Sequence, residues 1–375
     1  MLWRYKNIYI PKLRFKEFKK EWESNTIENI FKITRGLVIA KSKISKEKNE
    51  NFCYPVYSSQ TKNNGLMGYY NEYLYDKAIT WTTDGYAGIV SFRNEKFYCT
   101  NVCGVLLEKK YKPNLCISKI IGKETRKYVM KYLAIPKLMN NTMAKIKIFF
   151  PEQIEEQEKI SRFFSLLDHQ ISLLENKLQL IEQIRKFIFS LNVKYDNKKI
   201  KDAFNLLEGF PFKSTDYNPK GNKVLTIKNI AINKIDASNI KKTLKVIDSK
   251  YQINKNDIIC AITGAAGLKF SLSDDTYYFN QRTMKITSKN NDFEEILLLL
   301  LLFNKKKSWI NSLATGSQKN ISKKTIQNIF ILKKTNKNIL ISKILNKLAK
   351  YDELLSLKKK FKLNLKKYYL LNLFT

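Results

Sequence analysis

Two polar stretches of this 375-residue sequence contain the side chains best suited to recognition chemistry. Residues 137–151 and residues 313–332 mix amides, hydroxyls and lysines, as in Asn140, Asn141 and Lys145 of the first stretch. Amides form paired hydrogen bonds with adenine edges, and lysines bind phosphate oxygens. The stretches therefore favour hydrogen bonding to a nucleic acid, although ordinary solvated loops have the same composition.

Residues that could carry catalysis or bind a metal are few. The chain has one histidine, His169, and five cysteines without any Cys-x-x-Cys spacing, which argues against a disulfide framework and a zinc centre. It contains no Pro-Pro pair, and therefore no Asn/Asp-Pro-Pro-aromatic motif of an adenine methyltransferase, and no Walker A motif. Asp168 and Asp352 lie outside any carboxylate cluster and are interpreted as structural acids. We therefore predict a non-catalytic chain.

The charge of the chain favours a polyanionic partner. Lysine and arginine total 69 against 33 acids, which gives a net charge of +36 and an isoelectric point near 9.8. Lysine enrichment in an AT-rich genome and a membrane surface are the alternatives. No signal peptide is recognised, and the longest apolar run, Ile296–Phe303, predicts a buried helix because a bilayer span needs about 20 residues. The reduced cysteines favour a cytoplasmic location.

Two long helical patterns divide the sequence. In residues 152–192 apolar residues recur at alternating spacings of four and three, which predicts one seam of a coiled coil, and acids fill the first turns after Pro151. The seam consists of Ile160, Phe164, Leu167, Ile171, Leu174, Leu178, Ile181 and Ile188. No glycine or proline interrupts this helix, which would be about 60 Å long.

The second helical pattern, residues 338–374, repeats the first. We expect its seam at Ile344, Leu348, Tyr351 and Leu355, with a slip and a resumption at Leu357, Phe361, Leu365 and Tyr368. Asp352 matches Asp168, and residues 366–368 match residues 185–187. Two such seams can be buried against each other, which predicts an antiparallel helix pair.

The regions between the helices are also repeated. Residues 81–92 and 261–272 each follow an apolar run and hold two glycines, and residues 96–107 parallel residues 276–287. Alternating aromatic and β-branched residues predict strands in both regions, and the glycines predict tight turns.

In this order, and repeated, these patterns resemble the specificity subunits of type I restriction–modification enzymes over essentially the whole chain. The resemblance is carried by the lead-in Pro11–Ser24, the turn Gly85–Phe92, the stretch Lys137–Ile148 and the helix Glu155–Phe187. It implies that two target recognition domains each read half of a split double-stranded DNA site. It also implies that the helices set the spacer and dock two methyltransferase subunits, which restriction subunits join. S-adenosylmethionine, ATP and Mg²⁺ would belong to those partners, and no cofactor to this chain.

We therefore predict an α+β fold in which two similar mixed α/β target recognition domains are separated by two long antiparallel coiled-coil helices, with a pseudo-two-fold internal repeat. The predicted domains are residues 1–151, including a lead-in, a central spacer helix 152–193, a second recognition domain 194–335 and a C-terminal spacer helix 336–375. A standalone nucleic-acid-binding protein and a nuclease with an unrecognised site are the alternatives.

The residues predicted to contact DNA lie in loops and turns of both domains. In the first domain they are Ser59, Gln60, Lys62, Asn63, Thr83, Tyr86, Asn140, Asn141 and Lys145. In the second they are Lys213, Lys228, Asn229, Thr263, Lys269, Gln281, Arg282, Ser317, Gln318 and Lys319. The outer helix faces are the predicted docking surface, and the twelve lysines of residues 333–367 suit either a partner or passing DNA.

Overall fold

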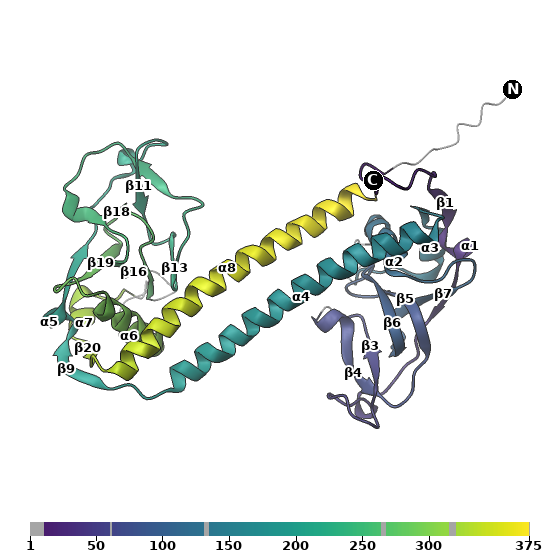
Figure 1. Cartoon of the computed structure of the whole chain (residues 1–375), viewed down its shortest axis with the longest axis horizontal. Coiled ribbons are helices and arrows are strands. Elements are labelled where there is room, and N and C mark those ends of the chain that lie inside the picture. Colours follow the sequence, from purple (N-terminus) through teal and green to yellow (C-terminus); the bar gives the residue numbers. More distant parts are fainter. Residues whose placement is uncertain (1–10, 61, 131–134, 264–267, 315–319, 375) are drawn as a thin grey trace. The chain divides into compact units, whose positions relative to one another are not determined.

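The chain folds into two compact units, each containing one mixed α/β region and part of both long helices (Figure 1). The structure is a computed structural model, described here for residues 11–60, 62–130, 135–263, 268–314 and 320–374. Unit 1 comprises Met1–Glu175 and Lys358–Thr375, and unit 2 comprises Asn176–Leu357. The boundary between the units therefore lies inside both long helices.

Unit 1 is built on a six-stranded sheet with the strand order β2-β7-β5-β6-β3-β4, beside a two-stranded sheet of β1 and β8. Its core joins Ile79 and Trp81 of the central strand β5 to Ile117 of α2 and Phe164 of the first long helix. The elements are β1 (Glu23–Thr26), α1 (Ile27–Ile30), β2 (Phe31–Arg35), η1 (Lys41–Lys43), β3 (Tyr54–Tyr57), η2 (Lys62–Gly65), β4 (Leu66–Tyr70), β5 (Tyr75–Thr82), β6 (Val90–Cys99), β7 (Cys103–Glu108), α2 (Leu115–Glu124), η3 (Thr125–Lys127), α3 (Asn140–Lys145) and β8 (Lys147–Phe150).

Unit 2 contains two four-stranded sheets, with the orders β10-β19-β16-β17 and β14-β11-β18-β15, and the pairs β12-β13 and β9-β20. The predicted apolar helix is confirmed as α6, in which residues 296–303 are all buried. The elements are β9 (Tyr195–Lys199), α5 (Ile200–Ala203), β10 (Phe204–Glu208), η4 (Ser214–Asp216), β11 (Asn222–Leu225), β12 (Ile230–Ala231), β13 (Lys234–Ile235), β14 (Lys241–Thr243), η5 (Ser249–Tyr251), β15 (Gln252–Ile253), β16 (Ile258–Ala261), β17 (Lys269–Leu272), β18 (Tyr277–Phe279), β19 (Thr283–Ser288), α6 (Phe293–Ser312), α7 (Lys323–Gln327) and β20 (Phe330–Leu332).

Equivalent backbone hydrogen bonds confirm the internal repeat. The Gly36 N–H donates to the carbonyl of Cys103, as the Gly209 N–H donates to the carbonyl of Thr283, both at 3.0 Å. The strand order β2-β7-β5-β6 matches β10-β19-β16-β17, and β3 runs parallel to β6 as β11 runs parallel to β18. The predicted match of residues 96–107 with residues 276–287 is therefore correct.

The long helices are α4 (Ile154–Ser190) and α8 (Asn336–Asn372), each of 37 residues and within two residues of the predicted ends. In unit 1 the beginning of α4 packs on the end of α8, where the rings of Phe163 and Tyr369 lie 4.7 Å apart. In unit 2 the end of α4 and the beginning of α8 share a core that contains Ile188 and Ile341. The helices are therefore antiparallel, and the predicted fold class is confirmed.

The predicted seam of α4 is confirmed, but that of α8 is correct only at Leu348 and Leu355. Of the predicted α8 residues, only Leu355 is buried, whereas Tyr351, Phe361 and Tyr368 are exposed. The inward face instead recurs without a slip at positions 341, 345, 348, 352, 355, 359, 362, 366, 369 and 373. Four of these positions hold Asp352, Lys359, Lys362 and Lys366, and an apolar pattern cannot reveal a seam that contains charges.

Asp352, Lys359 and Lys366 of this face form ion pairs with the other helix. Lys366 lies 2.5 Å from Asp168 in unit 1, and Arg185 lies 3.1 Å from Asp352 in unit 2. These are the residues that the sequence comparison matched, so each acid of the repeat pairs with the corresponding base. The pairing fixes the register of the two helices in the same way in both units.

A lysine of each domain binds the end of one long helix. The Lys305 ammonium in α6 donates to the carbonyls of Phe189 and Leu191 at the end of α4, at 2.6 and 2.7 Å. Lys123 in α2 donates to the carbonyl of Phe374 beyond the end of α8, at 2.5 Å. Cations at helix C-termini satisfy unpaired carbonyls and interact favourably with the helix dipole. The two lysines are therefore equivalent anchors of the repeat.

Candidate nucleic-acid interface

The predicted contact residues of unit 1 gather beyond the last residue of β5. The Thr83 N–H donates to the carbonyl of Val102, and the Leu138 N–H donates to the carbonyl of Thr83, at 3.0 and 2.9 Å. The Gly85 N–H donates to the carbonyl of Pro136 at 3.0 Å. The turn that carries Tyr86 therefore lies beside the segment that leads into α3, where Asn140, Asn141 and Lys145 are found.

A half-buried arginine, Arg93, holds the loop of residues 58–65 against the same sheet. The Arg93 guanidinium donates from Nη2 to the carbonyl of Asn64 at 2.9 Å and from Nε to Oγ1 of Thr80 at 3.1 Å. It also lies 3.6 Å from the centre of the Tyr57 ring, whose hydroxyl donates to Glu95 at 2.6 Å. Burial lowers the pKa of Arg93, and the Tyr57 contact opposes that shift. The sequence analysis missed Arg93, because a lone arginine on a strand has no distinguishing pattern.

The side chains of this loop differ in their exposure and in whether they already form a hydrogen bond. Asn63 is exposed with a φ of 50°, in the left-handed region that asparagine tolerates, and Lys62 opens η2. Gln60 is exposed but already donates to the carbonyl of Leu66, and Ser59 is half-buried. The exposed amide of Asn63 can therefore contact a ligand without first breaking a bond such as that of Gln60.

The predicted residues after β5 and in α3 divide into buried and exposed ones. Thr83 is only 6% exposed, and its hydroxyl donates to Asp84 at 2.7 Å, so it supports the turn. Tyr86, Asn141 and Lys145 are exposed, and Asn140 is half-buried. This end of unit 1 thus combines an aromatic ring, amides and an ammonium group.

The corresponding strand ends of unit 2 gather the predicted residues of the second domain. The Gln281 N–H donates to the carbonyl of Phe210 at 3.0 Å, and the Ile262 N–H donates to the carbonyl of Arg282 at 3.4 Å. The side chains of Gln281 and Arg282 are exposed, and Thr263 directly follows Ile262. Lys269 begins β17 opposite Ala261. The same end of the sheet is therefore polar and basic in both units.

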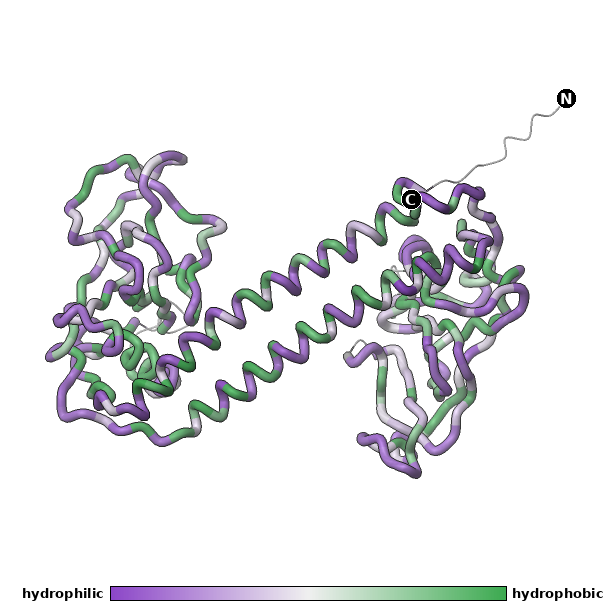
Figure 2. The backbone as a smooth tube through the Cα atoms, viewed as in Figure 1, coloured by the Kyte–Doolittle hydropathy of each residue, from purple (hydrophilic) through white to green (hydrophobic). Residues whose placement is uncertain are grey.

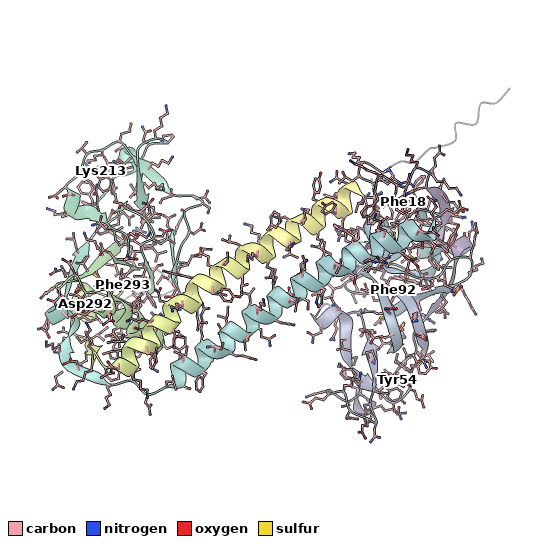
Figure 3. The ribbon with its side chains drawn as sticks, viewed as in Figure 1. Phe18, Tyr54, Phe92, Lys213, Asp292 and Phe293 are labelled. Atoms are coloured by element: carbon pink, nitrogen blue, oxygen red, sulfur yellow. The ribbon has the colours of Figure 1, made fainter. Side chains whose placement is uncertain are left out.

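The remaining predicted residues of unit 2 lie near these strand ends with different surroundings. Lys213 is exposed three residues after Phe210 and is labelled in Figure 3. Lys228 is exposed in the turn that follows β11. Asn229 is only 3% exposed, and its amide bonds the backbone of Thr226 and Asp236 at 3.0 and 2.9 Å, so it holds the turn together. Ser317, Gln318 and Lys319 lie outside the described residues.

The long helices carry a second surface, which consists of exposed apolar residues spaced by seven. We call it the outer stripe (hydropathy is drawn along the backbone in Figure 2). On α4 its residues are between 45% and 64% exposed, and on α8 between 46% and 62%. The α4 residues are Leu166, Leu173, Leu180 and Phe187, and the α8 residues are Leu340, Leu354, Phe361 and Tyr368. The spacing was readable in the sequence, but two of these eight residues, Phe361 and Tyr368, were assigned to the seam.

Metal chemistry and membrane insertion find no support in the described ranges. No group of three or more histidine, cysteine, aspartate or glutamate side chains is placed there to hold a metal ion. None of the described helices is long and apolar enough to cross a membrane.

Comparison with known proteins identifies relatives of the chain. The sequence profile of the type I restriction modification DNA specificity domain matches residues 19–183 and again residues 192–367. A putative type I specificity subunit of Mycoplasma pneumoniae is 37% identical over 165 residues, which are 44% of this chain and 44% of that protein. The type I restriction enzyme MpnII specificity subunit of the same organism is 40% identical over 144 residues, which are 37% of this chain and 42% of that protein.

The matched segments thus span less than two thirds of these relatives. A solved structure covers nearly the whole chain. The crystal structure of the type I restriction–modification system S subunit from M. genitalium superposes with a TM-score of 0.75 over 98% of this chain and 99% of that one. The sequence identity of the pair is 15%, so this likeness establishes the fold alone.

Proposed function

The chain belongs to the type I restriction–modification DNA specificity family, and from this we propose that it reads a two-part DNA sequence on behalf of methyltransferase and restriction subunits. Each unit reads one half of the site through its polar strand ends. The chain itself performs no chemistry, and S-adenosylmethionine, ATP and Mg²⁺ are bound by the partners in the cytoplasm.

The observation that carries the proposal is the equivalence of the two polar strand ends. Both present exposed donors on a scaffold held by the same backbone bonds, as at Tyr86 and Asn141 in unit 1 and at Gln281 and Arg282 in unit 2. Arginine suits guanine, amides suit adenine, and lysines hold phosphate. Two readers with different side chains on one scaffold suit two different half-sites.

The long helices set the spacing between the half-sites in this proposal. A helix of 37 residues is about 55 Å long at about 1.5 Å per residue. One turn of DNA advances about 34 Å, so the helix matches between one and two turns. Two linked readers gain affinity through effective concentration only when the spacing of the DNA fits.

The outer stripe is the proposed docking surface for two methyltransferase subunits. A heptad of exposed apolar residues matches the requirement of an amphipathic partner helix. Because the repeat places Leu173, Leu180 and Phe187 in register with Leu354, Phe361 and Tyr368, the two stripes can receive two copies of the same partner. A standalone nucleic-acid-binding protein, the second candidate function, leaves these stripes without a role.

Methylation sequencing tests the proposed function. Cells expressing this chain together with the methyltransferase encoded beside it are compared with cells lacking either protein. We expect a split methyl-adenine motif only when both proteins are present. No motif in any combination contradicts the proposal and favours the standalone binder.

Variants assign the half-sites to the units. We expect Gln281→Ala and Arg282→Ala to relax only one half of the motif, and Asn141→Ala only the other half. Equal loss at both halves would show that these residues do not read sequence.

The docking surface is tested by a charge placed on the outer stripe. Leu180→Glu is expected to abolish co-purification of the methyltransferase, because it buries a carboxylate in the contact. Gln179→Glu adds the same charge on the opposite flank of α4 and serves as the control. Equal co-purification of both variants would place the partner elsewhere.

A further inference from the structure

Tyr86 is an exposed aromatic residue at the tip of the turn between β5 and β6. Its side chain is 62% exposed, and its ring makes no ring contact or hydrogen bond with the rest of the described chain. The neighbouring Ile89, Ile135 and Met139 are also exposed, on segments that the backbone bonds of the turn hold together. Clustered apolar exposure of this kind marks an interaction surface.

The turn that carries Tyr86 is fixed at four points. Its glycines, Gly85 and Gly88, have φ values of 74° and 82°, which glycine adopts without strain. The Gly88 N–H donates to the carbonyl of Thr82 at 2.9 Å, and the Thr125 hydroxyl donates to the carbonyl of Gly88 at 2.9 Å. The Thr82 hydroxyl donates to the carbonyl of Tyr86 itself. Together with the hydrogen bond from the Gly85 N–H to the carbonyl of Pro136, these bonds hold the backbone that carries the exposed ring in one conformation.

The charge around the ring identifies its partner. Lys145, Arg126 and Lys127 are exposed on the flanking elements α3 and η3, and Lys137 precedes α3. The nearby acids Asp84 and Glu124 pair with Lys137 and Lys127, at 3.7 and 2.6 Å, so the excess positive charge comes from Lys145 and Arg126. Basic side chains around an exposed aromatic ring suit DNA. The phosphates of DNA are anionic, and its stacked bases form an apolar surface into which a ring can insert.

We propose that Tyr86 enters the base stack of the half-site read by unit 1 and stacks on a base there. This inference rests on the proposed function and goes beyond it, because it assigns a deformation of the DNA to one residue. Aromatic stacking on a base contributes about 1–3 kcal/mol, which corresponds to about 5- to 150-fold in affinity. A rigid ring retains most of that free energy, because little conformational entropy is lost on binding.

Fluorescence of 2-aminopurine tests the insertion. Duplexes that contain the methylated motif carry 2-aminopurine at successive positions of each half-site and are titrated with the chain assembled with its methyltransferase, without S-adenosylmethionine. We expect a rise in fluorescence that depends on Tyr86 at one step of a single half-site, because unstacking relieves the quenching of 2-aminopurine; bases extruded by the methyltransferase respond in the wild type and in the Tyr86 variants alike. Tyr86→Ala is expected to remove the rise and weaken binding about 5- to 150-fold, whereas Tyr86→Phe retains both.

Tyr73→Ala is the matched control. Tyr73 is an exposed tyrosine of the same unit, but the centre of its ring lies 5.0 Å from that of Tyr54. Its ring therefore already packs against another aromatic side chain. We expect this variant to bind and to report unstacking as the wild type does. Binding without any rise, or binding in which every rise survives Tyr86→Ala, overturns the insertion and leaves the proposed function standing. Absence of salt-dependent binding by the wild type overturns both.

Discussion

Replacing Lys305 by methionine removes two hydrogen bonds from the end of α4 and leaves the apolar stem of the side chain in place. The ammonium donates to the carbonyls of Phe189 and Leu191 at 2.6 and 2.7 Å. In the variant these carbonyls lose a charged donor, and the end of the helix loses a favourable cation. Lys123→Met does the same to the end of α8, where the lysine makes one bond, to Phe374.

The expected cost follows from these contacts. A hydrogen bond to a charged group contributes about 1.5–3 kcal/mol, and a cation at a helix C-terminus about 0.3–2 kcal/mol. Burial lowers the pKa of Lys305, which shows that its charged form is partly desolvated and that part of this gain is offset. We therefore expect Lys305→Met to cost about 2 kcal/mol and Lys123→Met about 1 kcal/mol.

Hydrogen exchange followed by mass spectrometry measures the effect locally. Lys305→Met is expected to speed exchange in the last two turns of α4 about 30-fold, as about 2 kcal/mol requires. Lys123→Met should act only on the last turns of α8. Lys307→Met, two residues along α6, removes the same charge without contacting a helix end. Equal acceleration in the Lys305 and Lys307 variants would refute the anchoring role.

Three further predictions follow from the repeat and from the charges of unit 2. Gly36→Ala and Gly209→Ala place a Cβ 2.1 and 2.2 Å from a backbone carbonyl oxygen, so each should lower the free energy of unfolding by more than about 2 kcal/mol in urea titrations. A hydrogen bond from Lys334 holds the pKa of Asp292 below its usual 3.8, so its stabilisation is present at neutral pH and is lost as the pH falls through that lowered pKa. Asp292→Asn should therefore melt below the wild type at pH 7, and the difference should shrink as the pH falls below 3.8. Arg185→Asp should destabilise the chain and Asp352→Arg should restore it, with a coupling of about 0.5–1 kcal/mol in a double-mutant cycle.

The fold was predictable where local pattern and tertiary environment agree. Glycines at the strand ends, apolar alternation in the sheets and an uninterrupted run of helix formers are each visible without a partner. Asp168 was visible as the equivalent of Asp352, and Arg185 as the equivalent of Lys366, although the contacts Asp168–Lys366 and Arg185–Asp352 were not. The internal repeat indicated which distant segments correspond in the fold, because two copies of one sequence pattern adopt the same arrangement of strands and helices.

The sequence failed where burial reverses the usual preference of a residue. Lys359, Lys362 and Lys366 occupy the inward face of α8, and the apolar residues that an amphipathic pattern would place there point outward. Asn229 looked like an exposed amide but is consumed by its own turn. Lys359 and Lys366 pair with acids of the other helix, and Asn229 bonds the backbone of its own turn; the periodicity of a single sequence records neither kind of partner.

The repeat separates positions that must match from positions that are free to differ. Gly36 and Gly209 match because any Cβ there meets the backbone of a neighbouring strand end. The side chains that hold the adjoining loops do not match. In unit 1 Arg93 bonds the backbone of the loop after β3, whereas in unit 2 Asn229 bonds the backbone of the turn after β11. Since the loops are locked by different chemistry on equivalent strands, each can present its own side chains without disturbing the shared scaffold. That independence is what a reader of two unlike half-sites requires.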